Sequence, residues 1–189
     1  MNARFLLSTL AIAFLAAGCT TTPNLATDTS MEAKRSSLDA DADAALQNLA
    51  TQVPSSRELV RQAHGVLVFP SVISAGLVVG GSHGRGVLRS GTTTAGYYNV
   101  TGASVGLLAG ADSKAVFVLF MTQDSLDRFV ASHGWTAGVD ASVTLLKVGA
   151  DGTVTTQTVQ QPIVGFAVVN GGLMANVSLE GMKVSRVDR

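Results

Sequence analysis

The sequence predicts an α+β domain, in which N-terminal helices plus one inserted helix pack on a strongly curved, barrel-like antiparallel β-sheet. Short β-branched runs separated by glycines fill most of the chain from residue 66 onward, which is typical of strands. The 20 glycines fall at strand edges and inside strands, where they favour bends, bulges and close backbone approach in a curved sheet. Apolar residues recur at helical spacing before residue 66 and again at 123–132.

The composition excludes some classes of protein. Hydrophobic residues make up 47% of the chain and charged residues 14%, which fits a packed core and not a disordered tail. Lys plus Arg equals Asp plus Glu at 13 each, so overall charge gives no reason to expect a nucleic-acid partner. A single cysteine cannot form an intrachain disulfide.

The N-terminus has the pattern of an export signal. Arg4 precedes an uncharged apolar run at 5–17, which is too short for a spanning helix of about 20 residues. The run ends in Leu15-Ala16-Ala17-Gly18-Cys19, which resembles the bacterial lipobox. That resemblance implies a lipoprotein whose Cys19 carries the lipid, with enough acyl chains for stable anchoring.

These observations divide the chain into a lipoprotein signal peptide at 1–18, a lipidated tether at 19–28 and one domain at 29–189. The domain has a helical N-terminal part at 29–64 and a β-rich core at 65–189. Thr20 stands where an aspartate would retain a lipoprotein at the inner membrane, so we expect an envelope protein at the outer membrane. The sequence does not distinguish the periplasmic side of that membrane from the cell surface.

The helical part begins with Thr29-Ser30-Met31-Glu32, a capping-box pattern that predicts a helix start at Thr29. Pro54 ends this helix, and Ser55 or Ser56 caps a second one through His64. The first helix is polar on most faces, with four apolar residues at helical spacing: Leu38, Ala42, Leu46 and Leu49.

The β-rich part contains the inserted helix at 123–132 and a hairpin turn at Asp151-Gly152. Strands are predicted at 66–69, 76–80, 86–88, 97–101, 103–109, 115–121, 137–148, 154–159, 164–169, 173–177 and 182–187.

The glycine-rich segment 80–86 is the first candidate for a ligand site. No helix start follows it and no Lys-Ser/Thr completes a phosphate loop, so a tight hairpin is the better interpretation. The hairpin would bring His83, Arg85 and Arg89 near one another, where the arginines could pair with lipid phosphate. The alternative is that these three residues lie on a solvent-exposed strand edge and bind no ligand.

Other motifs give little support for catalysis. Gly102-Ala103-Ser104-Val105-Gly106 matches a nucleophile elbow, but the sequence after it predicts a strand and not the required helix. Asp140 and Glu180 are expected to be structural hydrogen-bond acceptors. The three histidines do not have metal-ligand spacing, so neither a metal nor a cofactor is assigned.

The segment from Ala63 to Asp188 resembles the SYLF domain family. The motifs that carry this resemblance follow in order along the chain: Ala63-His64-Gly65-Val66-Leu67-Val68-Phe69-Pro70, Ala75-Gly76-Leu77, Gly80-Gly81, Gly84-Arg85-Gly86-Val87-Leu88, Tyr97-Tyr98, Gly106-Leu107, Gly110-Ala111, Leu119-Phe120-Met121-Thr122, Gly134-Trp135, Gly138-Val139-Asp140-Ala141-Ser142-Val143, Gly172-Leu173-Met174-Ala175 and Ser178-Leu179-Glu180-Gly181.

The resemblance implies a non-enzymatic binding module, since eukaryotic members bind phosphoinositides and some bind actin, while bacterial members are often lipoproteins. This chain differs from members with an amphipathic membrane-binding helix, because residues 30–49 are acidic and lack a basic-aromatic face. We therefore expect a membrane-anchored domain that binds a phospholipid headgroup or an envelope component. The alternatives are a structural or protein-interaction lipoprotein and, remotely, a serine hydrolase using Ser104.

Overall fold

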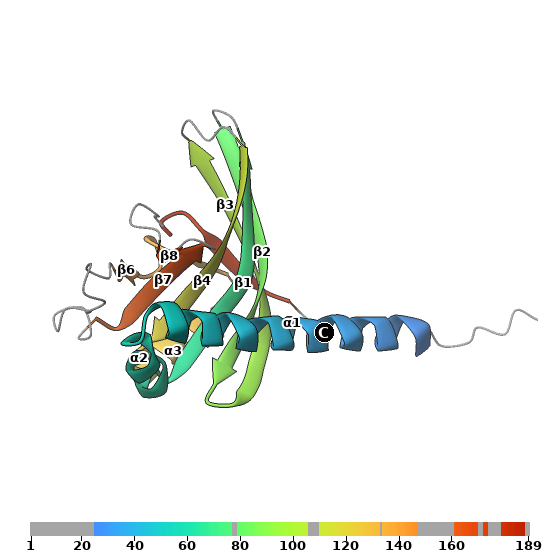
Figure 1. The fold of residues 1–189 in the computed structure, drawn as a ribbon, viewed down its shortest axis with the longest axis horizontal. Coiled ribbons are helices and arrows are strands. Elements are labelled where there is room, and N and C mark those ends of the chain that lie inside the picture. Colours follow the sequence, from blue (N-terminus) through green and yellow to red (C-terminus); the bar gives the residue numbers. More distant parts are fainter. Residues whose placement is uncertain are drawn as a thin grey trace, which may run out of the picture.

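The computed structural model describes residues 25–76, 79–105, 110–132, 134–146, 161–169, 172–173 and 179–187 (Figure 1). Helices and strands within these residues follow in the order α1 (Leu25–Gln52), α2 (Ser56–Gln62), β1 (Gly65–Gly76), β2 (Val79–Ser90), β3 (Thr93–Val105), β4 (Gly110–Phe120), α3 (Gln123–Ala131), β5 (Trp135–Thr136), β6 (Thr144–Leu145), β7 (Ile163–Val169), β8 (Gly172–Leu173) and β9 (Lys183–Arg186).

The nine described strands form one strongly curled sheet, which confirms the predicted α+β class. The strand order is β5-β9-β3-β2-β1-β4-β7-β6, and β8 pairs with β7. All of these pairs are antiparallel except β6 with β7, which run parallel, so the sheet is mixed and not purely antiparallel as the sequence predicted.

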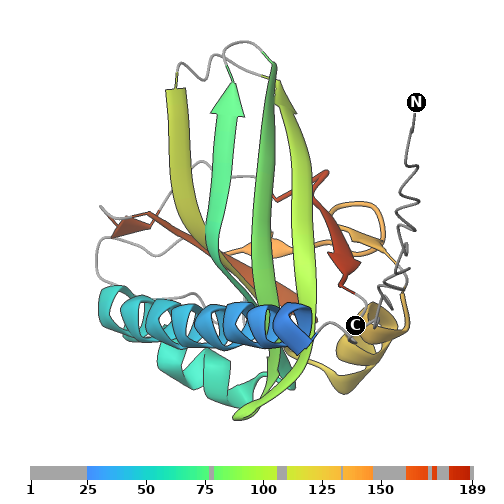
Figure 2. The ribbon, with the colours of Figure 1, turned by 90° about the vertical axis from the view of Figure 1, so that its right-hand side faces the viewer.

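The sheet has a hydrophobic core on each face. Helix α1 crosses the strands on one face, and α2 lies beside it (Figure 2). Of the four α1 residues predicted at helical spacing, Ala42 and Leu49 are fully buried and Leu38 and Leu46 are partly buried against the same cluster. On the other face, Phe129 of α3 packs among aromatic rings at 4.8–5.7 Å between centroids: Tyr98, Phe120 and Trp135.

The outer halves of β1 to β4 rise beyond α1 as a four-stranded projection (Figures 1 and 2). We call this projection, residues 72–76, 79–84, 100–105 and 110–114, the β-arm. Its α1-side face carries mostly small side chains, and Ile73 stands out among them with 57% of its surface exposed. The α1-side face of the β-arm is therefore exposed where the β-arm rises beside α1.

The helix boundaries differ from the sequence prediction at the start of α1 and at the end of α2. Helix α1 begins at Leu25, so Thr29 lies inside the helix and is not its N-cap. Ser55 occupies the N-cap position of α2 without a capping side-chain hydrogen bond, and α2 ends at Gln62. Helix α3 matches its prediction, and Thr122 caps it by accepting a hydrogen bond from the Ser125 amide at 3.3 Å.

The predicted hairpin at 80–86 is wrong, because these residues lie inside the continuous strand β2. Gly84 and Gly86 are needed there for close approach. A Cβ on Gly86 would lie 2.4 Å from the Phe69 ring, and one on Gly84 would lie 2.8 Å from the Ser71 carbonyl oxygen. The true turn after β2 contains Gly91, whose φ of +60° favours glycine.

Two other strand predictions fail and one cannot be compared. Gly76 of β1 pairs with Gly80 of β2, so no single strand spans the predicted range 76–80. Within the strand predicted at 137–148, the described residues form a turn at 138–140 and the two-residue strand β6. The Asp151-Gly152 hairpin, the strand at 154–159 and residues 174–177 lie outside the described residues, as do the signal peptide and Cys19.

Candidate functional site

Helix α1 has a cavity along each of its two flanks. Residues two positions apart on a helix lie about 200° apart around its axis, so they face opposite flanks. Ser36 and Asp39 line one flank, whereas Lys34 and Asp41 line the other. We call the first space the latch-side pocket, after the polar cluster described in the next paragraph. We call the second, which faces the β-arm, the arm-side groove.

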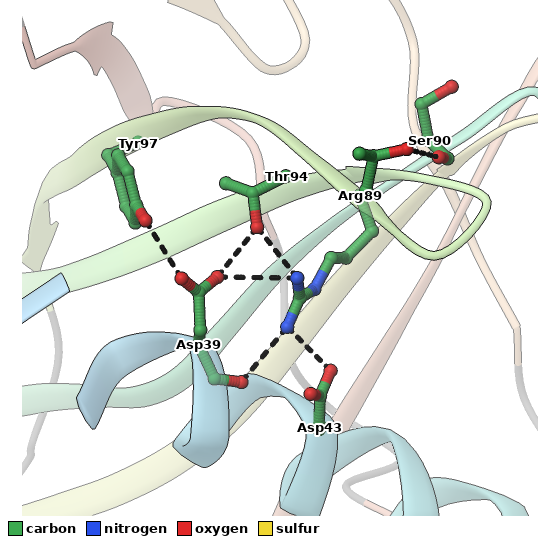
Figure 3. Close-up of polar contacts among 7 residues, drawn as sticks. Asp39, Asp43, Arg89, Ser90, Thr94 and Tyr97 are labelled. Atoms are coloured by element: carbon green, nitrogen blue, oxygen red, sulfur yellow. Dashed lines mark hydrogen bonds and ion pairs between the residues drawn. The ribbon is translucent and has the colours of Figure 1, made fainter. Parts of the chain in front are cut away.

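A polar cluster fastens α1 to the sheet at the latch-side pocket (Figure 3). The Arg89 guanidinium, on β2, donates to Asp43 Oδ1 at 2.7 Å and to the Asp39 carbonyl oxygen at 3.1 Å, and it lies 3.3 Å from Asp39 Oδ1. The Asp39 carboxylate also accepts hydrogen bonds from Thr94 at 2.7 Å and from Tyr97 at 2.8 Å. We call these five residues the latch.

The latch is built around a mostly buried arginine. Only 11% of the Arg89 side chain is exposed, compared with 28% for Asp39 and 59% for Asp43. Burial, the hydrogen bond to Asp39 and the charge of that carboxylate raise the pKa of Tyr97 above 10.0, against the opposing charges of Arg35 and Arg89. The Tyr97 phenol is therefore held in its protonated, donating form.

The latch-side pocket has a volume of about 910 Å³ and mixed charge. Its described lining includes two carboxylates, Glu32 and Asp39, and two guanidinium groups, Arg35 and Arg186. In formal charge the two carboxylates balance the two guanidinium groups, so the described lining of this pocket has no net charge.

The N-terminal end of the arm-side groove is cationic. This end has a volume of about 280 Å³, and Lys34 and Arg35 from α1 and Arg85 from β2 all line it. It shares Arg35, Tyr97 and Val187 with the latch-side pocket. Arg35 also lies over the Tyr97 ring, 5.4 Å from its centroid, which favours one orientation of the guanidinium. The other described lining residues are uncharged: Met31, Leu38, Tyr97, Tyr98, Asn99 and Val187.

The three sequence-predicted ligand residues do not form one cluster. Arg85 is exposed and lines the cationic end, whereas Arg89 is engaged in the latch. His83 is exposed on the β-arm, two residues from Arg85 on the same face of β2, and lines none of the three described cavities. A ligand role for each of them stays a prediction.

Sequence reasoning missed the partners that α1 supplies. Lys34 and Arg35 join Arg85 from about 50 residues away in the chain, and Asp39 and Asp43 join Arg89. The spacing of the two aspartates was a usable signal, since residues at i and i+4 share a helix face and can hold one cation together. From the sequence alone, the aspartates indicated only that residues 30–49 are acidic.

The described structure gives little support for catalysis by Ser104 and gives Asp140 a structural role. Residues 102–105 lie inside β3, so the strand-to-helix turn of a nucleophile elbow does not occur at Ser104. Asp140 accepts a hydrogen bond from the Thr136 amide at 2.5 Å, which closes a turn and confirms its structural role. Within the described ranges, no group of His, Cys, Asp or Glu side chains is placed to hold a metal ion.

The fold and site together define a small α+β binding module with a charged groove. Residues 101–189 match the Ysc84 family, described as Las17-binding protein actin regulator. This match supports a SYLF domain family assignment, as the resemblance in the motifs of the chain implied. No curated protein matches the chain. None of the described helices combines the length and apolar character needed to cross a membrane.

Proposed function

We propose that this protein is an exported bacterial lipoprotein, held at the outer membrane by lipid on Cys19, whose SYLF domain binds the phosphate of an anionic lipid headgroup. The supporting observation is the meeting of Lys34, Arg35 and Arg85 in the arm-side groove. None of these three side chains forms an ion pair with another described residue.

The cationic end suits a phosphate. Guanidinium groups pair with phosphate oxygens through two parallel hydrogen bonds, and an ammonium adds a third charge-assisted donor. The groove also has apolar side chains at its rim, including Met31 with 40% of its surface exposed. A headgroup could place its phosphate among the cations and its glycerol portion against this rim.

The proposed anchor lies within reach of the groove. Leu25 follows Cys19 by six positions (25 − 19), a length of chain that can span at most about 20 Å when extended. Lys34 lies nine residues further along α1 (34 − 25), or about 14 Å of helix. A domain tethered in this way would hold its cationic end near the surface of the membrane that anchors it.

Vesicle flotation tests this proposal with residues 20–189, which include every described helix and strand. We expect the protein to float with vesicles of phosphatidylglycerol mixed with phosphatidylethanolamine and not with phosphatidylcholine alone. Arg85→Gln should abolish most of this binding. Arg57→Gln is a matched control, because Arg57 is an exposed α2 residue that lines none of the described cavities. Equal flotation of both variants would contradict the proposal.

A protein-interaction role is the second candidate, and the exposed Ile73 on the β-arm favours it. An isoleucine on an open face of small side chains is a plausible contact for a partner protein. Whole-cell crosslinking should then recover one protein with the native chain and lose it with Ile73→Asp. Unchanged crosslinking would remove the observation on which this candidate rests.

A further inference from the structure

The arm-side groove continues past its cationic end along the same flank of α1. Five α1 residues that line it follow at intervals of four, three, four and three, which keeps them on one helix face: Lys34, Leu38, Asp41, Ala45 and Asn48. The first two border the cationic end, and the last three border a second space of about 440 Å³.

The two spaces meet where β1 and β2 pair. Ser71 of β1 lines the second space and Arg85 of β2 lines the cationic end, and these residues are direct cross-strand partners on the same sheet face. The Ser71 hydroxyl is hydrogen-bonded to the Ser113 hydroxyl at 2.9 Å, so neither side chain extends far across the floor. The two spaces are therefore neighbours on this face of the sheet.

The second space is lined largely by small and apolar side chains. Its walls come from α1, β1, β4 and β7: Ala44, Ala45, Pro70, Ala115, Val168 and Val169. Polar atoms are confined to Asp41, Asn48, Ser71 and Ser113 among the described lining residues. The one carboxylate among them would repel a phosphate from this half of the groove.

We propose that the arm-side groove binds one whole single-chain phospholipid, with its phosphate at Lys34, Arg35 and Arg85 and its acyl chain along Ala44, Ala45 and Val168. This inference rests on the proposed function and adds an apolar subsite to it. The orientation follows from charge complementarity, since cations line one end and apolar walls with Asp41 line the other. The small side chains of Ala44 and Ala45 border the space of about 440 Å³ that would receive the acyl chain.

Calorimetry with residues 20–189 separates the two subsites. We use two probes that share a headgroup: glycerophosphoglycerol, which has no acyl chain, and lysophosphatidylglycerol with a short chain kept below its micelle concentration. The lysolipid should bind at least about tenfold more tightly, because burial of even two methylenes gives a gain of that order. Equal affinity of the two probes would overturn the acyl-chain subsite.

Two tryptophan variants locate the tail. Ala44→Trp should fill the second space and remove the advantage of the lysolipid, while leaving glycerophosphoglycerol binding unchanged. Ala40→Trp is the control: Ala40 is exposed on the same helix and lines none of the described cavities. An unchanged advantage in Ala44→Trp would overturn the inference. Failure of glycerophosphoglycerol itself to bind would instead count against the proposed headgroup site.

Discussion

Removal of the Arg89 guanidinium should measurably loosen α1. In Arg89→Met, the side chain keeps its length but loses the contacts to Thr94, Asp39 and Asp43 at 2.6–3.3 Å. Hydrogen bonds to charged groups contribute about 1.5–3 kcal/mol, and the half-exposed Asp43 regains water when released. We expect the free energy of unfolding to fall by about 2 kcal/mol, which lowers Tm by about 4–8 °C in a chain of this length.

Urea denaturation followed by tryptophan fluorescence measures this loss, since Trp135 is the only tryptophan in the chain. Its ring contacts Phe129 edge-on at 5.7 Å in the core. Asp43→Asn alone should cost less than about 1 kcal/mol, because exposed ion pairs contribute little. A double-mutant cycle of Arg89→Met with Asp39→Asn should give a coupling energy of about 1 kcal/mol or more. A loss below about 0.5 kcal/mol in Arg89→Met would refute the latch.

Gly86→Ala should lower the free energy of unfolding by about 1–3 kcal/mol in urea, because its Cβ would lie 2.4 Å from the Phe69 ring and 2.6 Å from a backbone oxygen. Tyr97 and Tyr98 should both ionise above 10.0 in an absorbance titration, because burial raises the pKa of each. Their contribution to stability is complete below the unfolded pKa of about 10 and is lost as pH rises through the folded values. Cys19→Ala should move the protein out of the membrane fraction, as judged by immunoblot.

Each of these measurements has a control. Gly81→Ala should be mild, since the nearest atom to its Cβ is 3.9 Å away. In urea both phenols should return to the ordinary pKa, and a native titration at that value would contradict the burial of Tyr98. If a Cys19→Ala protein without its signal still pellets with membranes, the folded domain binds lipid by itself.

Local patterns in the sequence predicted those elements whose structure is decided locally. Helix α3 was predicted within one residue because Leu126 and Phe129 face the core at helical spacing and Thr122 is a good cap. Strand β7 was found because its β-branched run is buried. The start of α1 was predicted four residues too late, because the sequence at Thr29 matches a capping pattern although the helix already begins at Leu25.

The site depended on contacts that no local pattern contains. The glycines of 80–86 resemble a turn in sequence, but Gly86 is required by the Phe69 ring on the neighbouring strand. Arg85 was predicted as a ligand residue without its partners, because Lys34 and Arg35 reach it only when α1 crosses β2. Crossing of a helix over a sheet is a tertiary event, so composition and periodicity could not place these charges together.

Helix α1 is a partition shared by two compartments. Lys34 and Asp41 border one compartment while Ser36 and Asp39 border the other, so one rigid body sets the width of both. A sideways displacement of α1 would widen the latch-side pocket and narrow the arm-side groove, or the reverse. The Arg89 contacts to Asp39 and Asp43 hold this helix on the sheet, so the residues that stabilise α1 also fix the width of the spaces beside it.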